Sequence, residues 1–252
     1  MSRSLTIQIN SHDRVSGSAT DFTVNLGKDH KISNVRAVAI KSLQMVNSFY
    51  NINQYNNIWY YDQGGAELSI VVPVGQYNIT QLIAAIQQQF QLAGIVIGII
   101  DNPLSHKLSF SAVPDISYYK TRPDGSLNPI HRVLGIRSGD PLNPVKDYDA
   151  QAVHDLSGVK SVNITSNVLA GGMGISSRDS GSKLALLDVC PINVPFGAVV
   201  HSDPVDLQLD SLTYDNVLNN NLTVVDIQLR DEDNNVLDSN DLNVVISLKI
   251  YH

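Results

Sequence analysis

The chain is short of charge, cysteine and long apolar runs, and each shortage excludes a class of protein. Charged residues make up 16% of the 252 residues, well below the roughly one quarter that is usual. A single cysteine, Cys190, excludes an internal disulfide. The sequence contains no run of about eighteen apolar residues and its first residues lack an apolar signal core. We therefore expect neither a membrane-spanning helix nor a secretory signal.

The charge balance bears on the partners of the chain. The formal net charge is −7, and lysine and arginine form no cluster. Binding to a nucleic-acid backbone needs clustered cations, so we expect no direct nucleic-acid partner. Asparagine, glutamine, serine and threonine take the polar positions instead, which favours strands and loops over helices. A surface with few charges also tolerates close packing against other proteins.

Alternating apolar and polar residues predict about a dozen short strands. The clearest are the last two, over residues 225–230 and 242–251. Others are predicted over residues 5–9, 22–26, 35–46, 58–62, 67–74, 95–100, 107–113, 159–169, 183–189, 198–201 and 205–212.

One helix is predicted between the strands. Asn78 or Thr80 can cap it, and Gly94 offers a left-handed stop. Its apolar residues recur at helical spacing: Leu82, Ile83, Ile86 and Phe90. Residues 130–136 predict one further helical turn, and the Gly- and Ser-rich residues 170–182 predict a loop.

These patterns predict an all-β fold, a single jelly-roll sandwich of two antiparallel sheets with one inserted α-helix and long loops. We expect one domain over residues 1–252. Because both ends are good strands, the last strand is expected beside residues 5–9. The long link over residues 231–241 suits a crossing between sheets about 10 Å apart, so the last two strands are expected in different sheets.

The sequence shows no catalytic constellation. Metal-dependent jelly-roll enzymes need a His-x-His pair with a nearby Glu, and no such pair occurs. His12 and His154, each followed by Asp, are typical of solvated turns. Cys190, just before Pro191, is typical of a small buried hydrophobe. The Gly-rich residues 171–183 lack the Gly-Lys-Ser/Thr ending of a phosphate-binding loop.

Two polar segments are left as candidate contact sites. Asp231, Glu232 and Asp233 could hold calcium, but adjacent acids in a turn are usually solvated, so we predict a surface turn and no metal. The aromatic and amide-rich residues 49–61 suit sugar binding, because aromatic rings stack on sugars and amides hydrogen-bond to them. We favour an ordered loop or protein interface for that segment, with sugar binding as the alternative. The sequence predicts no catalytic residue, metal ligand or cofactor.

The order of segments resembles the penton, or minor capsid, proteins of virophages, polinton-like viruses and large nucleocytoplasmic DNA viruses. The likeness covers nearly the whole chain, with Asn235 where that family's turn often has glycine. The segments that carry it are VAIKSL at 38–43, NSFYNI at 47–52, GQYNITQL at 75–82, LG at 134–135, VNITSN at 162–167, PFG at 195–197 and IQLRDE at 227–232.

The resemblance implies a structural capsid protein rather than an enzyme. It implies a homopentamer at the fivefold vertices of an icosahedral capsid, surrounded by double-jelly-roll major capsid proteins, with other minor capsid or spike proteins as further partners. It also implies a place in the virion and assembly in a cytoplasmic virus factory of the infected cell. The candidate contact residues are Phe49, Tyr50, Tyr55, Asp231, Glu232 and Asp233. A carbohydrate- or receptor-binding jelly roll is the alternative function.

Overall fold

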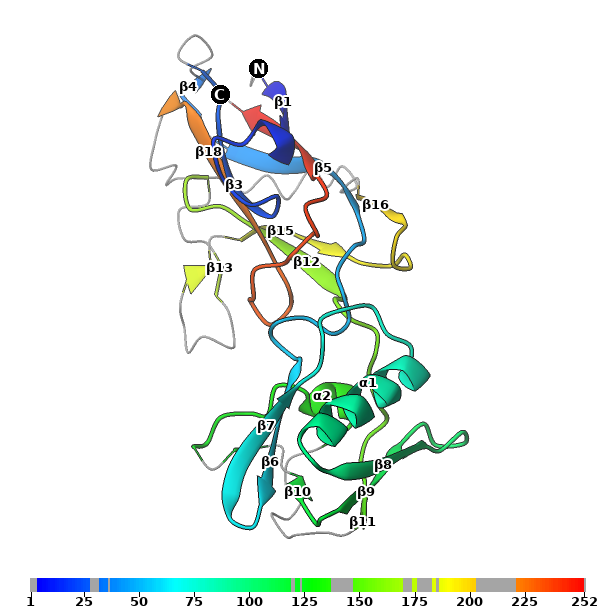
Figure 1. The fold of residues 1–252 in the computed structure, drawn as a ribbon. Coiled ribbons are helices and arrows are strands. Elements are labelled where there is room, and N and C mark those ends of the chain that lie inside the picture. Colours follow the sequence, from blue (N-terminus) through cyan, green and yellow to red (C-terminus); the bar gives the residue numbers. More distant parts are fainter. Residues whose placement is uncertain are drawn as a thin grey trace. The chain divides into compact units, whose positions relative to one another are not determined.

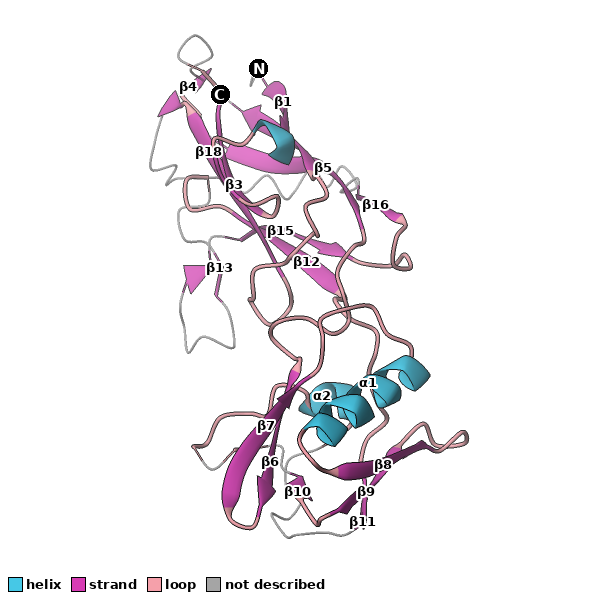
Figure 2. Ribbon diagram, in the orientation of Figure 1, coloured by secondary structure: helices cyan, strands magenta, loops and turns pink. Residues whose placement is uncertain are grey.

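A computed structural model describes residues 4–27, 32–35, 37–118, 121–122, 124–136, 147–169, 174–175, 183–184, 186–202 and 221–251. The chain divides into two compact units (Figure 1). One comprises Met1–Phe49 and Val159–His252, and the other comprises Tyr50–Gly158. The second unit is therefore an insertion between two halves of the first. Strands dominate both units (Figure 2).

The first unit is a jelly roll of two antiparallel sheets. One sheet has the order β1-β19-β5-β16 and the other β15-β12-β18-β3-β2. Strands β1, β3 and β5 alternate between the sheets, as do β16, β18 and β19, which is the winding of a jelly roll. The bounds are β1 Ser4–Asn10, β2 Ser16–Gly17, β3 Asp21–Asn25, β5 Ala37–Val46, β12 Ser161–Thr165, β15 Leu186–Pro191, β16 Val199–Ser202, β18 Val224–Arg230 and β19 Val245–Tyr251.

The two ends of the chain pair with each other, as the sequence predicted. Leu5 lies opposite Ile250 and Ile9 opposite Ile246, and β19 pairs on its other side with β5. Ile246, Leu248 and Ile250 are fully buried. Burying each such side chain stabilises the fold by about 1.5–3 kcal/mol. The apolar face of β19 therefore anchors the C-terminal strand in the core.

Strand β18 supplies the facing layer of that core. Val225, Ile227 and Leu229 are fully buried and belong to the same apolar cluster as the inward residues of β19. Strand β18 lies in the five-stranded sheet and β19 in the four-stranded one. The prediction that the last two strands belong to different sheets is confirmed.

Short elements complete the first unit. They are the 3-10 helix η1 Ser11–Asp13, the pair β4 Ile32–Ser33 and β17 Asn221–Leu222, and the pair β13 Gly174–Ile175 and β14 Lys183–Leu184.

The inserted unit has its own sheets, helices and core. Its sheets have the orders β10-β6-β7 and β11-β9-β8, and Trp59 packs edge-on against Phe90 and Phe110 at centroid distances of 5.2 and 5.5 Å. Such edge-to-face pairs add to the gain from burial. The bounds are β6 Ile58–Gln63, β7 Ala66–Val71, α1 Ile79–Leu92, β8 Val96–Asp101, β9 Leu108–Val113, β10 Ser117–Tyr118, α2 His131–Leu134 and β11 Asp147–Asp149.

Helix α1 begins and ends where its sequence signals predicted. The Asn78 side chain accepts from the Gln81 amide and the Gln81 side chain accepts from the Asn78 amide, which forms a capping box. Leu82, Ile86 and Phe90 are buried, and a left-handed Gly94 (φ 80°) follows the last turn.

The sequence did not predict the division into two units. It predicted one domain over residues 1–252, and the unfolding of both units as one domain stays a prediction. The predicted strand over residues 205–212 and most of the loop over residues 170–182 lie outside the described residues. Among the helices that are described, none is long and apolar enough to span a membrane.

Candidate functional site

The acidic turn after β18 is built around one carboxylate. Asp231 Oδ1 accepts from the backbone amides of Asp233 and Asn235 at 2.9 and 2.7 Å, and its Oδ2 accepts from Asn235 Nδ2 at 2.9 Å. Asn234 takes the left-handed conformation (φ 68°) that the turn requires, which asparagine tolerates better than most residues. The Asn163 side chain donates to the Asp231 carbonyl and so fastens the turn to β12.

The predicted contact residues of this turn therefore differ in role. Asp231 is buried, which corrects the expectation of a wholly surface-exposed turn, and both of its carboxylate oxygens are occupied by N–H donors. Glu232 is exposed and Asp233 is half-buried. Only the latter two present carboxylates that a partner can reach.

The aromatic run is mostly internal. Phe49 lies in the core of the jelly roll, and Trp59 and Tyr61 lie in the core of the inserted unit. Tyr50 is half-buried and Tyr55 is 42% exposed. Three of the six rings in residues 49–61 are thus buried and unavailable as a stacking platform for a sugar.

The amides of this run are engaged within the inserted unit. Asn51 is buried, its Nδ2 donates to the carbonyls of Tyr77 and Leu156, and its Oδ1 accepts from the Tyr77 amide. Ile52 pairs with Gly75 through both backbone hydrogen bonds. Asn51 consequently holds together the start of the unit, the approach to α1 and the end of the unit. Residues 49–61 form an ordered loop and strand.

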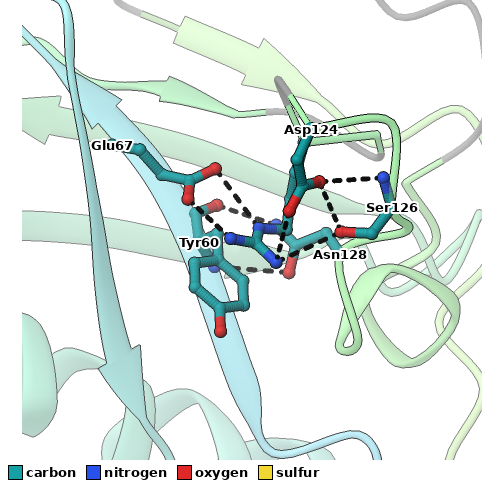
Figure 3. A network of polar contacts seen from close by, with 6 residues as sticks. Tyr60, Glu67, Asp124, Ser126 and Asn128 are labelled. Carbon is teal, nitrogen blue, oxygen red and sulfur yellow. Dashed lines mark hydrogen bonds and ion pairs between the residues drawn. The ribbon is translucent and has the colours of Figure 1, made fainter.

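A polar network fixes a surface loop of the same unit (Figure 3). The Arg122 guanidinium pairs with both oxygens of Glu67, at 2.7 and 3.2 Å, and lies 3.8 Å above the Tyr60 ring. Two hydrogen bonds from Ser126 lower the pKa of the Asp124 carboxyl, and Arg122 adds to this effect. The network fastens the loop after β10 to the β6–β7 hairpin.

The flanks of the jelly roll carry exposed apolar side chains. Strands β15 and β16 end their sheets on the flank where β15 contacts β5, and β1 and β2 end them on the other. Val189, Phe196 and Val199 are exposed on the first flank, and Leu5 and Val15 on the second. Because exposed apolar side chains lie on both flanks, both suit contact with another protein.

Cys190, His12 and His154 are the residues with reactive or metal-binding side chains that the sequence analysis considered. Cys190 is buried, and burial raises the pKa of its thiol, which disfavours the reactive thiolate. His12 is exposed in η1, as its sequence context predicted. The prediction of a solvated His154 is wrong, because its side chain is only 16% exposed and its Nε2 lies 3.6 Å from Asp101 Oδ1.

Asp101, His106 and His154 each offer a ligand atom, and these three atoms lie within 4.8 Å of one another. The sequence did not predict this cluster, because His154 lies far from the other two in the chain. Asp101 ends β8, His106 lies in the β8–β9 turn, and His154 follows β11. A His-x-His search cannot find ligands that come from separate segments.

Comparison with known proteins identifies the fold. No protein-family model matches the chain. No curated protein matches it either. Among solved structures, the selenomethionine-labelled mavirus penton protein is similar over 99% of this chain and 99% of its own, with a TM-score of 0.51 and 12% sequence identity. The chain thus shares its all-β, jelly-roll-containing fold with a mavirus penton protein over nearly its whole length.

Proposed function

We propose that this chain is a structural capsid protein, a penton subunit whose homopentamer closes the fivefold vertices of an icosahedral capsid. The observation that carries the proposal is the fold match to the mavirus penton protein over 99% of both chains. The jelly roll alone hosts many functions. A match that also spans the inserted unit is more specific than similarity of the jelly roll alone.

The flanks of the jelly roll supply a contact that can close a ring. In cyclic association, one flank of each subunit meets the opposite flank of the next. The flank with Val189, Phe196 and Val199 would meet the flank with Leu5 and Val15, so apolar side chains are buried on both sides. The other partners of the proposal are double-jelly-roll major capsid proteins and further minor capsid or spike proteins. Its place is the virion, assembled in a cytoplasmic virus factory.

Native mass spectrometry and sedimentation test the ring, with and without the major capsid protein. The expected species has five times the 27.5 kDa mass of one chain. Val199→Asp places a carboxylate in the proposed contact. The affinity between neighbouring subunits should fall by about 100-fold, because an unpaired buried charge costs several kcal/mol.

Val71→Asp is the matched control. Val71 is a strand residue of the inserted unit with 52% exposure, against 53% for Val199. It should leave the pentamer intact. Equal loss in both variants would refute the flank contact, and absence of the chain from purified particles would refute the proposed function itself.

A further inference from the structure

The inserted unit holds polar atoms that lack the partners their burial demands. Asp101 Oδ1 and both ring nitrogens of His154 are shielded from solvent, and none of them has a hydrogen-bond partner among the described residues. A buried polar atom without a partner destabilises a fold, because it loses its hydrogen bonds to water and gains none in return. Three such atoms in one place indicate a missing ligand, and His106 completes the group.

The backbone holds these side chains in place. The His154 amide donates to the His106 carbonyl at 3.1 Å, and the neighbouring amides of Ala152 and Asp155 donate to the carbonyls of Gly135 and Val133. Gly135 is left-handed, and a Cβ there would come within 2.3 Å of the Ala152 carbonyl oxygen. The segment that carries His154 is thus docked closely on its neighbours.

The turn that carries His106 is equally ordered. The Asn102 side chain accepts from the amides of Leu104 and Ser105, and the His106 amide donates to the Asn102 carbonyl. His106 itself has a positive φ of 51°. This conformation keeps its ring beside that of His154, with centroids 6.1 Å apart.

We infer that Asp101, His106 and His154 bind a divalent transition-metal ion, with Zn²⁺ as the best match. Two imidazoles and one carboxylate are a ligand set that zinc takes at about 2.0–2.2 Å, which separates tetrahedral ligand atoms by roughly 3.3–3.6 Å. The Asp101 to His154 distance of 3.6 Å already fits. The three ligand atoms lie within 4.8 Å of one another, so a change in the side-chain rotamer of exposed His106 would bring its nitrogen to that separation, and a water molecule would complete the fourth position. The ion would join the β8–β9 turn to the segment after β11.

Zinc titration of the chelator-treated, untagged chain tests this inference, with calorimetry for stoichiometry and Co²⁺ absorbance for ligand geometry. We expect one ion per chain, and a higher thermal midpoint of Trp59 fluorescence because Trp59 lies in the same unit. Asp101→Asn and His106→Asn should each weaken binding at least about tenfold. Asn tolerates the left-handed backbone at position 106, so that variant keeps its fold.

His12→Gln is the control, since it removes an exposed histidine from the other unit. It should bind zinc as the wild type does. Absence of a saturable site would overturn the inference and leave the Asp101–His154 pair as an ordinary ion pair. Unchanged affinity in His106→Asn would overturn it as well. Neither result depends on assembly, so the capsid proposal stands or falls separately.

Discussion

Replacing Asp231 tests whether this residue stabilises the fold or serves only as a contact with a partner. In Asp231→Ala, the amides of Asp233 and Asn235 and the Asn235 side chain lose their acceptor. Hydrogen bonds to a charged group contribute about 1.5–3 kcal/mol each. Water can replace some of them, because Asp233 and Asn235 are only half-buried. We therefore expect a loss of about 2–4 kcal/mol in the free energy of unfolding.

Asp231→Asn should lie between the wild type and the alanine variant. Its side-chain oxygen can still accept from the two backbone amides, but its NH₂ group faces the NH₂ of Asn235 and cannot accept from it. The expected loss is about 1 kcal/mol. Glu232→Ala is the control, because Glu232 is exposed and such surface changes stay within about 0.5 kcal/mol.

The assay is urea unfolding followed by far-UV circular dichroism, which reports the strands of both units, including those of the jelly roll. With a urea dependence of about 1–3 kcal/mol per molar, a loss of about 2–4 kcal/mol should lower the midpoint urea concentration of the alanine variant by roughly 0.7–4 M. An unchanged midpoint together with weakened assembly would show that Asp231 acts as a contact residue alone and does not stabilise the turn.

Three further perturbations follow from the structure. Asn51→Ala removes the Asn51 hydrogen bonds to the Tyr77 amide and to two carbonyls. The free energy of unfolding, followed by Trp59 fluorescence, should therefore fall by about 2–3 kcal/mol, and an unchanged value would contradict the role of Asn51. Burial raises the pKa of the Asp188 carboxyl above its ordinary 3.8, so its ionisation opposes folding and the wild type loses stability as pH rises from below that value. Asp188→Asn should be more stable than the wild type at pH 7 and should lose that advantage below about pH 4; an equal difference at both pH values would count against it. Arg122→Lys loses the paired contact with Glu67 and the stacking on Tyr60, so hydrogen exchange of the Gly125 amide should quicken several-fold, and unchanged protection would show that the network does not hold the loop.

The strand pattern predicted the jelly roll because strands β1, β18 and β19 each bury one face only. Residues 5–9, 225–230 and 242–251 alternate cleanly, and one face of each lies in the shared core. The pairing of β1 with β19 followed from two good strands that each needed a neighbour. The helix could be predicted equally well, because its capping residue Asn78 and the Gly94 that ends it lie next to it in the sequence.

The insertion left no comparable signal. Residues 50 and 158, where the chain enters and leaves the inserted unit, are not flanked by a long Gly-, Ser- or Pro-rich linker. Strands of both units share the same period, so alternation cannot assign a strand to a unit. Trp59 fluorescence reports the inserted unit and circular dichroism reports both. Coincident transitions would support the single domain that the sequence predicted, and separate ones would refute it.

The sites were the least predictable part, because their contacts are long-range. The burial of Asp231 depends on amides that only the folded turn brings to its carboxylate. The cluster of Asp101, His106 and His154 depends on a backbone pairing between two distant segments. Neither arrangement leaves a fixed spacing in the sequence.

A reconstruction of icosahedral particles from the infected cells that produce this chain would test whether it closes capsid vertices. We expect five copies of the chain around each fivefold axis, joined flank to flank through the jelly roll, with Val199 in the contact. Vertices built from a different protein, or particles that lack this chain, would contradict this expectation.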